Sequence, residues 1–209
     1  MVFKHYHSCI SGLIFVLCFV TVELKQNCKD GWMVPRNYHG KKAIELVGKQ
    51  EQKVTRNHLL TTIDNLSPEW SLSLNIRLYA PIPQVNNWAC NVVHVTKGGD
   101  KTHYGDRTPF IGIARTTTRF YIVGAIDGEN LGVNLQEVLQ MNQTYHLEVR
   151  QQYSKNGNYN YEIELDGQVV YRIDNSDARQ FYDVKVFASN DWQRPCPVYI
   201  SEFKITNFT

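Results

Sequence analysis

Residues 70–78 read Trp-Ser-Leu-Ser-Leu-Asn-Ile-Arg-Leu, and this stretch decides the fold class. Large apolar residues occupy every second position, and Ser, Asn or Arg fills the positions between them. A period of two places the apolar side chains on one face of an extended strand. Ala80-Pro81-Ile82-Pro83 ends the run, because proline cannot donate a ladder hydrogen bond. The stretch therefore predicts a β-strand with one buried face and one polar face.

The next segment, residues 88–111, has the order strand, polar loop, strand. Trp88 to Thr96 is rich in β-branched residues and ends at Gly98-Gly99, and Pro109 opens the following apolar run. Glycine supplies positive φ at little steric cost, and proline is excluded from the middle of a central strand. The loop between the two runs carries His103, Tyr104, Asp106 and Arg107. Loops on a rigid β scaffold are where binding groups usually lie.

Similar short runs recur along the rest of the chain. They are Lys42–Val47, Leu59–Ile63, Phe110–Ala114, Arg119–Ala125, Gly132–Leu135, Tyr145–Val149, Tyr159–Leu165, Val169–Ile173, Val184–Ala188 and Val198–Phe208. Leu135–Gln140 has helical leanings but is too short to be stable alone. The apolar parity slips between Ile200 and Phe203, which predicts a bulge near Ser201-Glu202.

Turn dipeptides separate several of these runs. Asp127-Gly128, Asn156-Gly157 and Asp166-Gly167 are typical of hairpins, because a type I′ turn requires positive φ at both central residues. About eleven to thirteen short strands at regular spacing, with no long helix, predict an all-β fold. We expect a two-sheet antiparallel jelly-roll sandwich.

The composition sets the size and the class of partner. A chain of 209 residues with 43% hydrophobic content is enough for one domain with a full core. The formal net charge of +2 is spread without long basic blocks. A nucleic-acid partner is not expected, because it would require a clustered basic face.

Residues 1–24 have the order of a secretory signal peptide. Lys4, His5 and His7 form the polar start, and Ile10–Val22 is an apolar run shorter than the roughly 20 residues of a membrane span. An uncleaved anchor is the alternative. We expect a secreted, extracellular protein without a membrane span in the mature chain. Residues 25–54 would form an N-terminal extension with the first strand, residues 55–209 the sandwich, and residues 25–209 one folded unit.

Secretion determines how the cysteines are interpreted. Cys9 and Cys18 leave with the signal, so Cys28, Cys90 and Cys196 remain in an oxidising compartment. An odd number predicts one bridge and one free or intermolecular thiol. We favour Cys90 with Cys196, since each lies beside a Trp-bearing turn or strand start, and this leaves Cys28 for another chain. A bridge between Cys28 and Cys196 is the alternative. The spacings match no zinc motif.

Three N-glycosylation acceptors are present, at Asn65, Asn142 and Asn207. Asn65 precedes Pro68, and Asn207 is close to the last residue of the sequence. We therefore expect Asn142 to be the best acceptor.

Two groups of residues offer catalytic or metal-binding chemistry. Glu162, Glu164 and Asp166 loosely resemble the acidic strand of retaining β-glucanases, which need two carboxyl groups about 5 Å apart. The order of residues differs, and a solvated outer face explains the same pattern. His94 and His103 with Asp106 could hold a metal, but the spacing is equally typical of a packed histidine and a loop histidine. We expect no catalytic residue, no metal and no cofactor, and calcium is not indicated.

Ligand-binding candidates cluster around the polar loop and a second Trp-bearing turn. They are Trp88, Tyr104, Asp106, Arg107 and Trp192. Arg107 could contact a carboxylate or sulfate, Asp106 could accept from sugar hydroxyls, and the aromatic rings offer stacking faces. The structural alternative is an ion pair between Asp106 and Arg107 that orders the loop.

The chain also resembles a recurrent module of secreted invertebrate proteins. The resemblance covers about residues 55–208 and is carried by the Gly-Asp-Arg-x-Pro element at 105–109 and by several other runs. Those runs are Asn91–Thr96, Val123–Asn130, Tyr159–Gly167 and Asp183–Trp192. It implies the concanavalin A-like jelly-roll superfamily of lectins, laminin G-like domains, pentraxins and some glucanases. The galectin elements His-x-Asn-x-Arg and Trp-x-x-Glu are absent from the sequence, and no calcium cluster of the legume-lectin or pentraxin type is evident.

Three functions remain open at this point. The first is an extracellular, lectin-like module that binds glycans or glycosylated partners and breaks no bonds. The second is a structural or adhesive protein of the extracellular matrix that acts through protein–protein contacts. The third is a glycoside hydrolase built on Glu162 and Glu164. Fold alone does not decide between them, because one fold hosts many functions.

Overall fold

A computed structural model of the chain describes residues 41–84, 88–99 and 102–208. The predicted signal peptide and Cys9, Cys18 and Cys28 lie outside these residues. Within the described part the fold is all-β with thirteen strands. The strands are β1 (Ile44–Val47), β2 (Gln52–Lys53), β3 (Leu59–Leu66), β4 (Trp70–Leu78), β5 (Ala89–Thr96), β6 (Phe110–Ala114), β7 (Arg119–Ile126), β8 (Glu129–Val138), β9 (Thr144–Lys155), β10 (Asn158–Leu165), β11 (Gln168–Asn175), β12 (Phe181–Phe187) and β13 (Val198–Asn207).

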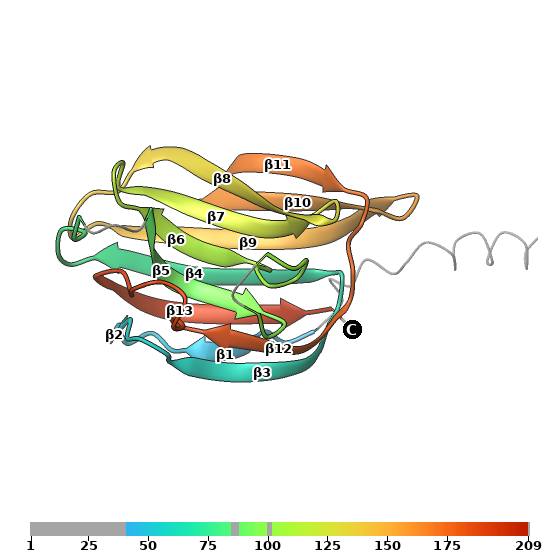
Figure 1. Cartoon of the computed structure of the whole chain (residues 1–209), viewed down its shortest axis with the longest axis horizontal. Coiled ribbons are helices and arrows are strands. Elements are labelled where there is room, and N and C mark those ends of the chain that lie inside the picture. The colour runs from blue at the N-terminus through green and yellow to red at the C-terminus, as the bar shows by residue number, and fades with distance from the viewer. Residues whose placement is uncertain (1–40, 85–87, 100–101, 209) are drawn as a thin grey trace, which may run out of the picture. The chain divides into compact units, whose positions relative to one another are not determined.

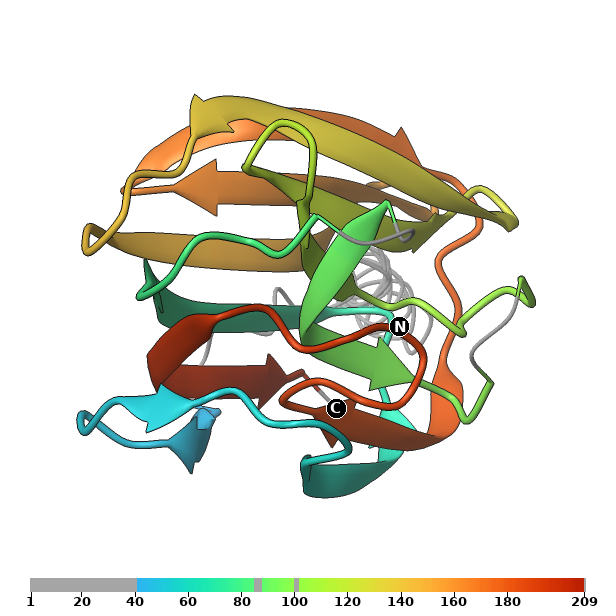
Figure 2. The same cartoon turned by 60° about the vertical axis from the view of Figure 1, so that its left-hand side comes forward.

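The strands form two antiparallel sheets, as the sequence predicts. One sheet has seven strands in the order β1-β13-β4-β9-β10-β11, with β2 also paired to β13. The other has six strands in the order β3-β12-β5-β6-β7-β8. In Figures 1 and 2, β8 and β11 follow one margin of the sandwich, and β1 and β3 follow the opposite margin. No helix in the described residues is long and apolar enough to cross a membrane.

The core lies between the sheets and is built from alternating positions. In β4 the apolar residues from Trp70 to Leu78 are all buried, and the residues between them are half-buried on the outer face. Leu72 pairs with Val149, and Leu74 pairs with Leu147 in the neighbouring β9. The period of two therefore gives a continuous apolar layer across the seven-stranded sheet.

The turn predictions are confirmed. Asp127-Gly128, Asn156-Gly157 and Asp166-Gly167 all have positive φ at both residues, as type I′ hairpins require. The register of β13 shifts between Ser201 and Lys204, and Glu202 adopts φ of 49°, so the predicted bulge is also present.

Residues 135–140, whose sequence has helical leanings but is too short for a stable helix, form no helix in the structure. β8 continues to Val138 because its backbone pairs with β7 over most of that length. A strand partner satisfies the backbone groups of a short segment that could not form a stable helix alone.

Candidate functional site

The connection between β12 and β13 folds back over the start of β5. The backbone N–H of Asn91 donates to the carbonyl of Arg194 at 2.8 Å, and that of Cys196 donates to the carbonyl of Asn91 at 2.8 Å. The side chain of Asn91 donates to Asn190 Oδ1 at 2.8 Å. The disulfide between Cys90 and Cys196 closes the same contact, which confirms the predicted pairing. These bonds hold Trp192 over the outer face of the six-stranded sheet.

Trp192 packs on aromatic side chains of that outer face. Its ring centroid lies 5.0 Å from that of Phe110 and 5.6 Å from that of His94. His94 and Phe110 are cross-strand partners in β5 and β6, and both are buried. They form an apolar floor that is separate from the core between the sheets.

Trp88 covers the neighbouring part of the same face. Its ring centroid lies 4.3 Å from that of Tyr121, edge to face, and 6.2 Å from that of Trp192. A Cβ at Gly132 would stand 2.1 Å from the Tyr121 hydroxyl, so this glycine lets the Tyr121 ring lie across β8. Trp88 remains 45% exposed. An indole that is both anchored and half open to solvent is a ready contact surface.

Arg107 completes this surface. Its guanidinium carbon lies 4.2 Å from the centroid of the Trp192 ring, which is a cation–π contact. Arg107 is half-buried, as are Trp192 and Tyr121. We call Trp88, Arg107, Tyr121 and Trp192 together the Trp platform. Of the predicted ligand residues, the structure brings Trp88, Arg107 and Trp192 together.

Asp106 does not belong to the Trp platform. Its side chain is 1% exposed, and its carboxylate accepts the backbone N–H of His103 at 3.1 Å. Its carbonyl lies 2.6 Å from Nε2 of His94. A buried carboxylate is not placed to accept hydrogen bonds from sugar hydroxyls, which is the role that the sequence predicts for Asp106. We assign Asp106 a role in ordering the loop. The guanidinium of Arg107, the other partner in the predicted ion pair, packs on the ring of Trp192.

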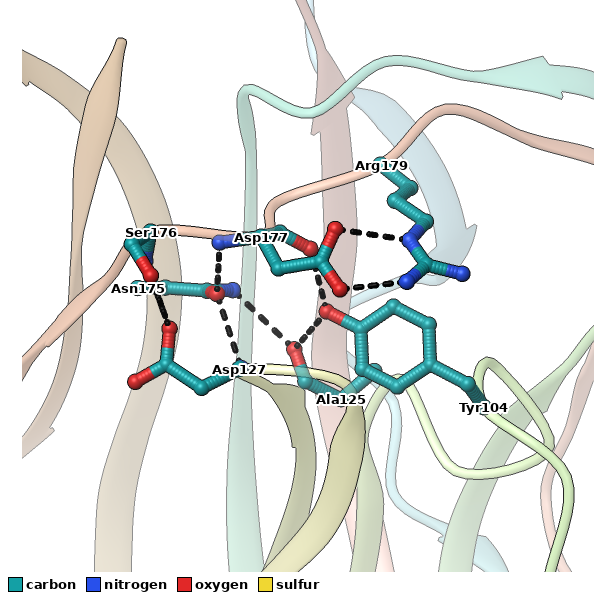
Figure 3. A network of polar contacts seen from close by, with 7 residues as sticks. All are labelled: Tyr104, Ala125, Asp127, Asn175, Ser176, Asp177 and Arg179. Atoms are coloured by element: carbon teal, nitrogen blue, oxygen red, sulfur yellow. Dashed lines mark hydrogen bonds and ion pairs between the residues drawn. The ribbon is translucent and has the colours of Figure 1, made fainter.

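Tyr104 lies in a different cluster of loops (Figure 3). Its hydroxyl donates to the carbonyl of Asp177 at 2.5 Å and lies 3.3 Å from that of Ala125. Arg179 covers the ring at 4.6 Å and forms an ion pair with Asp177. Burial raises the pKa of Tyr104. The structure therefore separates Tyr104 from the other predicted ligand residues and gives it a role in joining two connections.

Asn175 is the centre of the same cluster, and sequence reasoning missed it. Its Oδ1 accepts the backbone N–H groups of Asp127 and Asp177, at 3.0 and 3.1 Å. Its Nδ2 donates to the carbonyl of Ala125 at 3.1 Å and to Oε1 of Gln151 at 2.7 Å. Asn175 is fully buried. A buried amide with all these partners ties the β7–β8 turn to the β11–β12 connection.

The two glutamates of the hydrolase hypothesis lie in a network of arginines. Glu162 is 5% exposed, and its two oxygens form ion pairs with Arg150 at 2.7 Å and Arg172 at 2.5 Å. Arg150 also pairs with Glu164 at 3.2 Å and with Glu148 at 3.3 Å. These ion pairs form a charge network on the outer face of the seven-stranded sheet, and such a network is typical of a stabilising role.

The histidines of the metal hypothesis are not arranged as ligands. His103 Nδ1 lies 3.5 Å from Asp106 Oδ2, whereas His94 faces the Asp106 carbonyl. No group of three or more His, Cys, Asp or Glu side chains in the described residues could hold a metal ion.

The glycosylation acceptors differ in exposure. Asn142 is exposed in the turn before β9 and has φ of 62°. Asn65 and Asn207 are half-buried, and Nδ2 of Asn207 donates to the carbonyl of Asn65 at 2.7 Å while its Oδ1 accepts the N–H of Ser67.

Comparison with solved structures finds chains with a similar sandwich fold. A SAP-like pentraxin from Limulus polyphemus is 12% identical with a TM-score of 0.50, covering 80% of this chain and 77% of that chain. A mutant of HCR/D is 13% identical with a TM-score of 0.51, covering 81% of this chain and 44% of that one. Human galectin-16 is 14% identical with a TM-score of 0.38, covering 78% and 98%. The likeness concerns the fold, which is a two-sheet antiparallel jelly-roll sandwich. No family model and no curated protein matches the chain.

Proposed function

We propose that the protein is a secreted, non-catalytic recognition module that binds glycans through the Trp platform. One observation carries the proposal: Trp88 is 45% exposed although Tyr121 and Trp192 hold its ring in place. An anchored indole with an open face offers an apolar contact surface at little entropic cost. The C–H face of a pyranose ring has the shape and apolar character to stack on it.

The polar groups next to Trp88 would orient a sugar ring that stacks on it. The guanidinium of Arg107 lies over the indole of Trp192, so planar donors stand beside an apolar ring. Sites for small ligands combine apolar faces with a few oriented polar groups in this way. The proposal rests on this local chemistry, because a jelly-roll fold by itself hosts many functions.

A glycan array tests this proposal. The disulfide-bonded protein is compared with the variants Trp88→Ala and Tyr182→Ala. Tyr182 is 62% exposed on β12, and within the described residues its ring makes no contact with the Trp platform, so it is the matched control. We expect Trp88→Ala to weaken binding at least about tenfold and Tyr182→Ala to leave it unchanged. Equal binding by both variants, with circular dichroism unchanged, would remove the Trp platform from the proposal.

A structural or adhesive role is the second candidate, favoured by a separate surface. Val169 and Val170 are 45% and 46% exposed on β11, which is an edge strand of its sheet. An open pocket of about 480 Å³, lined in part by Leu135 and Val170, lies beside this edge. Apolar side chains on an unpaired strand edge favour association with another protein. A concentration-dependent mass in sedimentation that Val169→Lys abolishes would support this candidate, and a constant monomer mass would exclude self-association.

A further inference from the structure

Arg115 is a buried cation directly after β6, and its backbone bonds to that of Trp88. Its backbone N–H donates to the carbonyl of Trp88 at 3.1 Å, and its Nη1 donates to the carbonyl of Pro83 at 2.7 Å. The residue is only 3% exposed. Its Nε and Nη2 atoms are buried and have no hydrogen-bond partner within the described residues.

This burial leaves the charge of Arg115 without compensation. No carboxylate in residues 41–84, 88–99 and 102–208 forms an ion pair with it. Burial lowers the pKa of the Arg115 guanidinium, and the nearby positive charge of Arg194 lowers it further. Placing a guanidinium in a poorly solvated position is expensive unless an anion accompanies it. The local field is therefore positive and weakly screened.

Two further arginines add to this field. Arg194 is exposed, and its backbone is fixed by the hydrogen bond from Asn91 beside the disulfide. Arg119 in β7 pairs with Ala114 in β6, which pairs in turn with Ala89 in β5. Arg119 lies two residues before Tyr121 and therefore on the same face of the sheet. Its Nε is buried and, like those of Arg115, has no hydrogen-bond partner in the described residues. The side chain of Arg194 can contact a ligand directly, while Arg115 and Arg119 act through their charge.

We infer that the Trp platform has an anion subsite at Arg115, Arg119 and Arg194, which selects glycans that carry a carboxylate or a sulfate. The inference rests on the proposed function and specifies its ligand class. The backbone of Arg115 bonds to Trp88, and that of Arg194 bonds to Asn91, so we expect an acidic substituent of a sugar stacked on Trp88 to lie near this positive charge. Charge-assisted hydrogen bonds from an arginine are about twice as strong as neutral ones, so the acidic group would dominate the choice of ligand.

Isothermal titration with matched sugars tests the subsite. The probes are glucuronate against glucose, and galactose 6-sulfate against galactose, so that the carboxylate and sulfate sources are distinguished. We expect the disulfide-bonded protein to bind at least one acidic probe about tenfold or more tightly than its neutral partner. The preference is expected to shrink as the salt concentration rises.

Three variants divide the possible outcomes. Arg194→Gln is expected to abolish the preference for the acidic probe over its neutral partner. Arg115→Met removes the buried charge and is expected to reduce the same preference. Lys49→Gln removes an equal charge from the exposed β1–β2 turn and is expected to change nothing. Equal binding of acidic and neutral probes by the wild type overturns the anion subsite and leaves the proposed function standing. Retention of the acidic preference in Arg194→Gln and in Arg115→Met overturns the assignment to these arginines. Absence of binding to every probe and to the glycan array overturns both.

Discussion

The phenol ring of Tyr161 lies against Gly124 across the interior of the sandwich. A Cβ at Gly124 would stand 2.7 Å from Cζ of this ring. Tyr161 belongs to β10 of the seven-stranded sheet, and Gly124 belongs to β7 of the six-stranded sheet. Trp70 packs against the same ring, with 6.2 Å between the centroids. A missing side chain in one sheet thus makes room for a large ring from the other.

The first prediction concerns Gly124→Ala. The added methyl group would overlap a fully buried ring, so either the ring or the sheet must move. We expect the free energy of unfolding in urea to fall by about 1–3 kcal/mol. Gly48→Ala is the control, because a Cβ there meets only Glu45 Oε1 at 3.4 Å. A loss of stability in Gly48→Ala as large as that in Gly124→Ala would contradict the overlap.

The second prediction concerns the hydroxyl of Tyr161. It is buried and has no hydrogen-bond partner in the described residues. Burying an unpaired hydroxyl costs free energy, so Tyr161→Phe removes a penalty while keeping the ring. We expect the variant at pH 7 to be as stable as the wild type or more stable by about 1 kcal/mol. A clear loss of stability in urea denaturation would mean that the hydroxyl has a partner.

The third prediction concerns the pH dependence of the same residue. Burial raises the pKa of Tyr161 well above its usual range. Below about pH 10 the phenol is protonated in both states. Above that pH the unfolded chain loses the proton and the folded chain keeps it, so folding stability falls by about 1.4 kcal/mol per pH unit from this residue. The slope between pH 10 and 11.5 should therefore be shallower in Tyr161→Phe than in the wild type, and an equal slope in the two proteins would contradict the raised pKa of Tyr161.

The alternation of apolar and polar residues and the turn dipeptides were enough to predict the sandwich, because both signals lie within a few neighbouring residues. Residues 70–78 form β4 with the predicted bounds, and Asp166-Gly167 turns the chain as expected. Residues 136–138 were not predicted as strand, because the pairing of Val138 with Arg119 in β7 is not visible in the local pattern.

The candidate site could be predicted only in part, for the same reason. Trp88 and Trp192 were singled out as aromatic stacking faces near turns, but their contact depends on the disulfide-bonded connection between β12 and β13. Tyr121 could have been found, since the alternation of residues 119–125 places it opposite the core-facing Phe120 and Ile122. Arg115 and Asn175 carry no sequence signal, because their roles arise from burial in the assembled fold.

The fourth prediction concerns the disulfide. It joins Cys90 to Cys196 across a sequence separation of 106 residues. Closing so long a loop restricts the unfolded chain, so we expect Cys90→Ala with Cys196→Ala to lower stability by about 2–5 kcal/mol. Because the same connection holds Trp192, hydrogen exchange should rise first in residues 189–197. Unchanged exchange there would show that the hydrogen bonds of Asn91 suffice to hold the connection.

The last prediction concerns Asn175. Replacing it with alanine would leave Gln151 Oε1 and the N–H groups of Asp127 and Asp177 without their partner. We expect Asn175→Ala to lower the free energy of unfolding by about 2–4 kcal/mol, because buried polar groups left unpaired are costly. Asp174→Ala changes the exposed neighbouring residue and should stay within about 0.5 kcal/mol of the wild type. The hydroxyl of Tyr104 bonds to the carbonyl of Asp177, so loss of Asn175 should also speed proteolysis at residues 176–180, whereas loss of Asp174 should not. Equal proteolysis in the two variants would show that Tyr104 and Arg179 alone hold the connection in place.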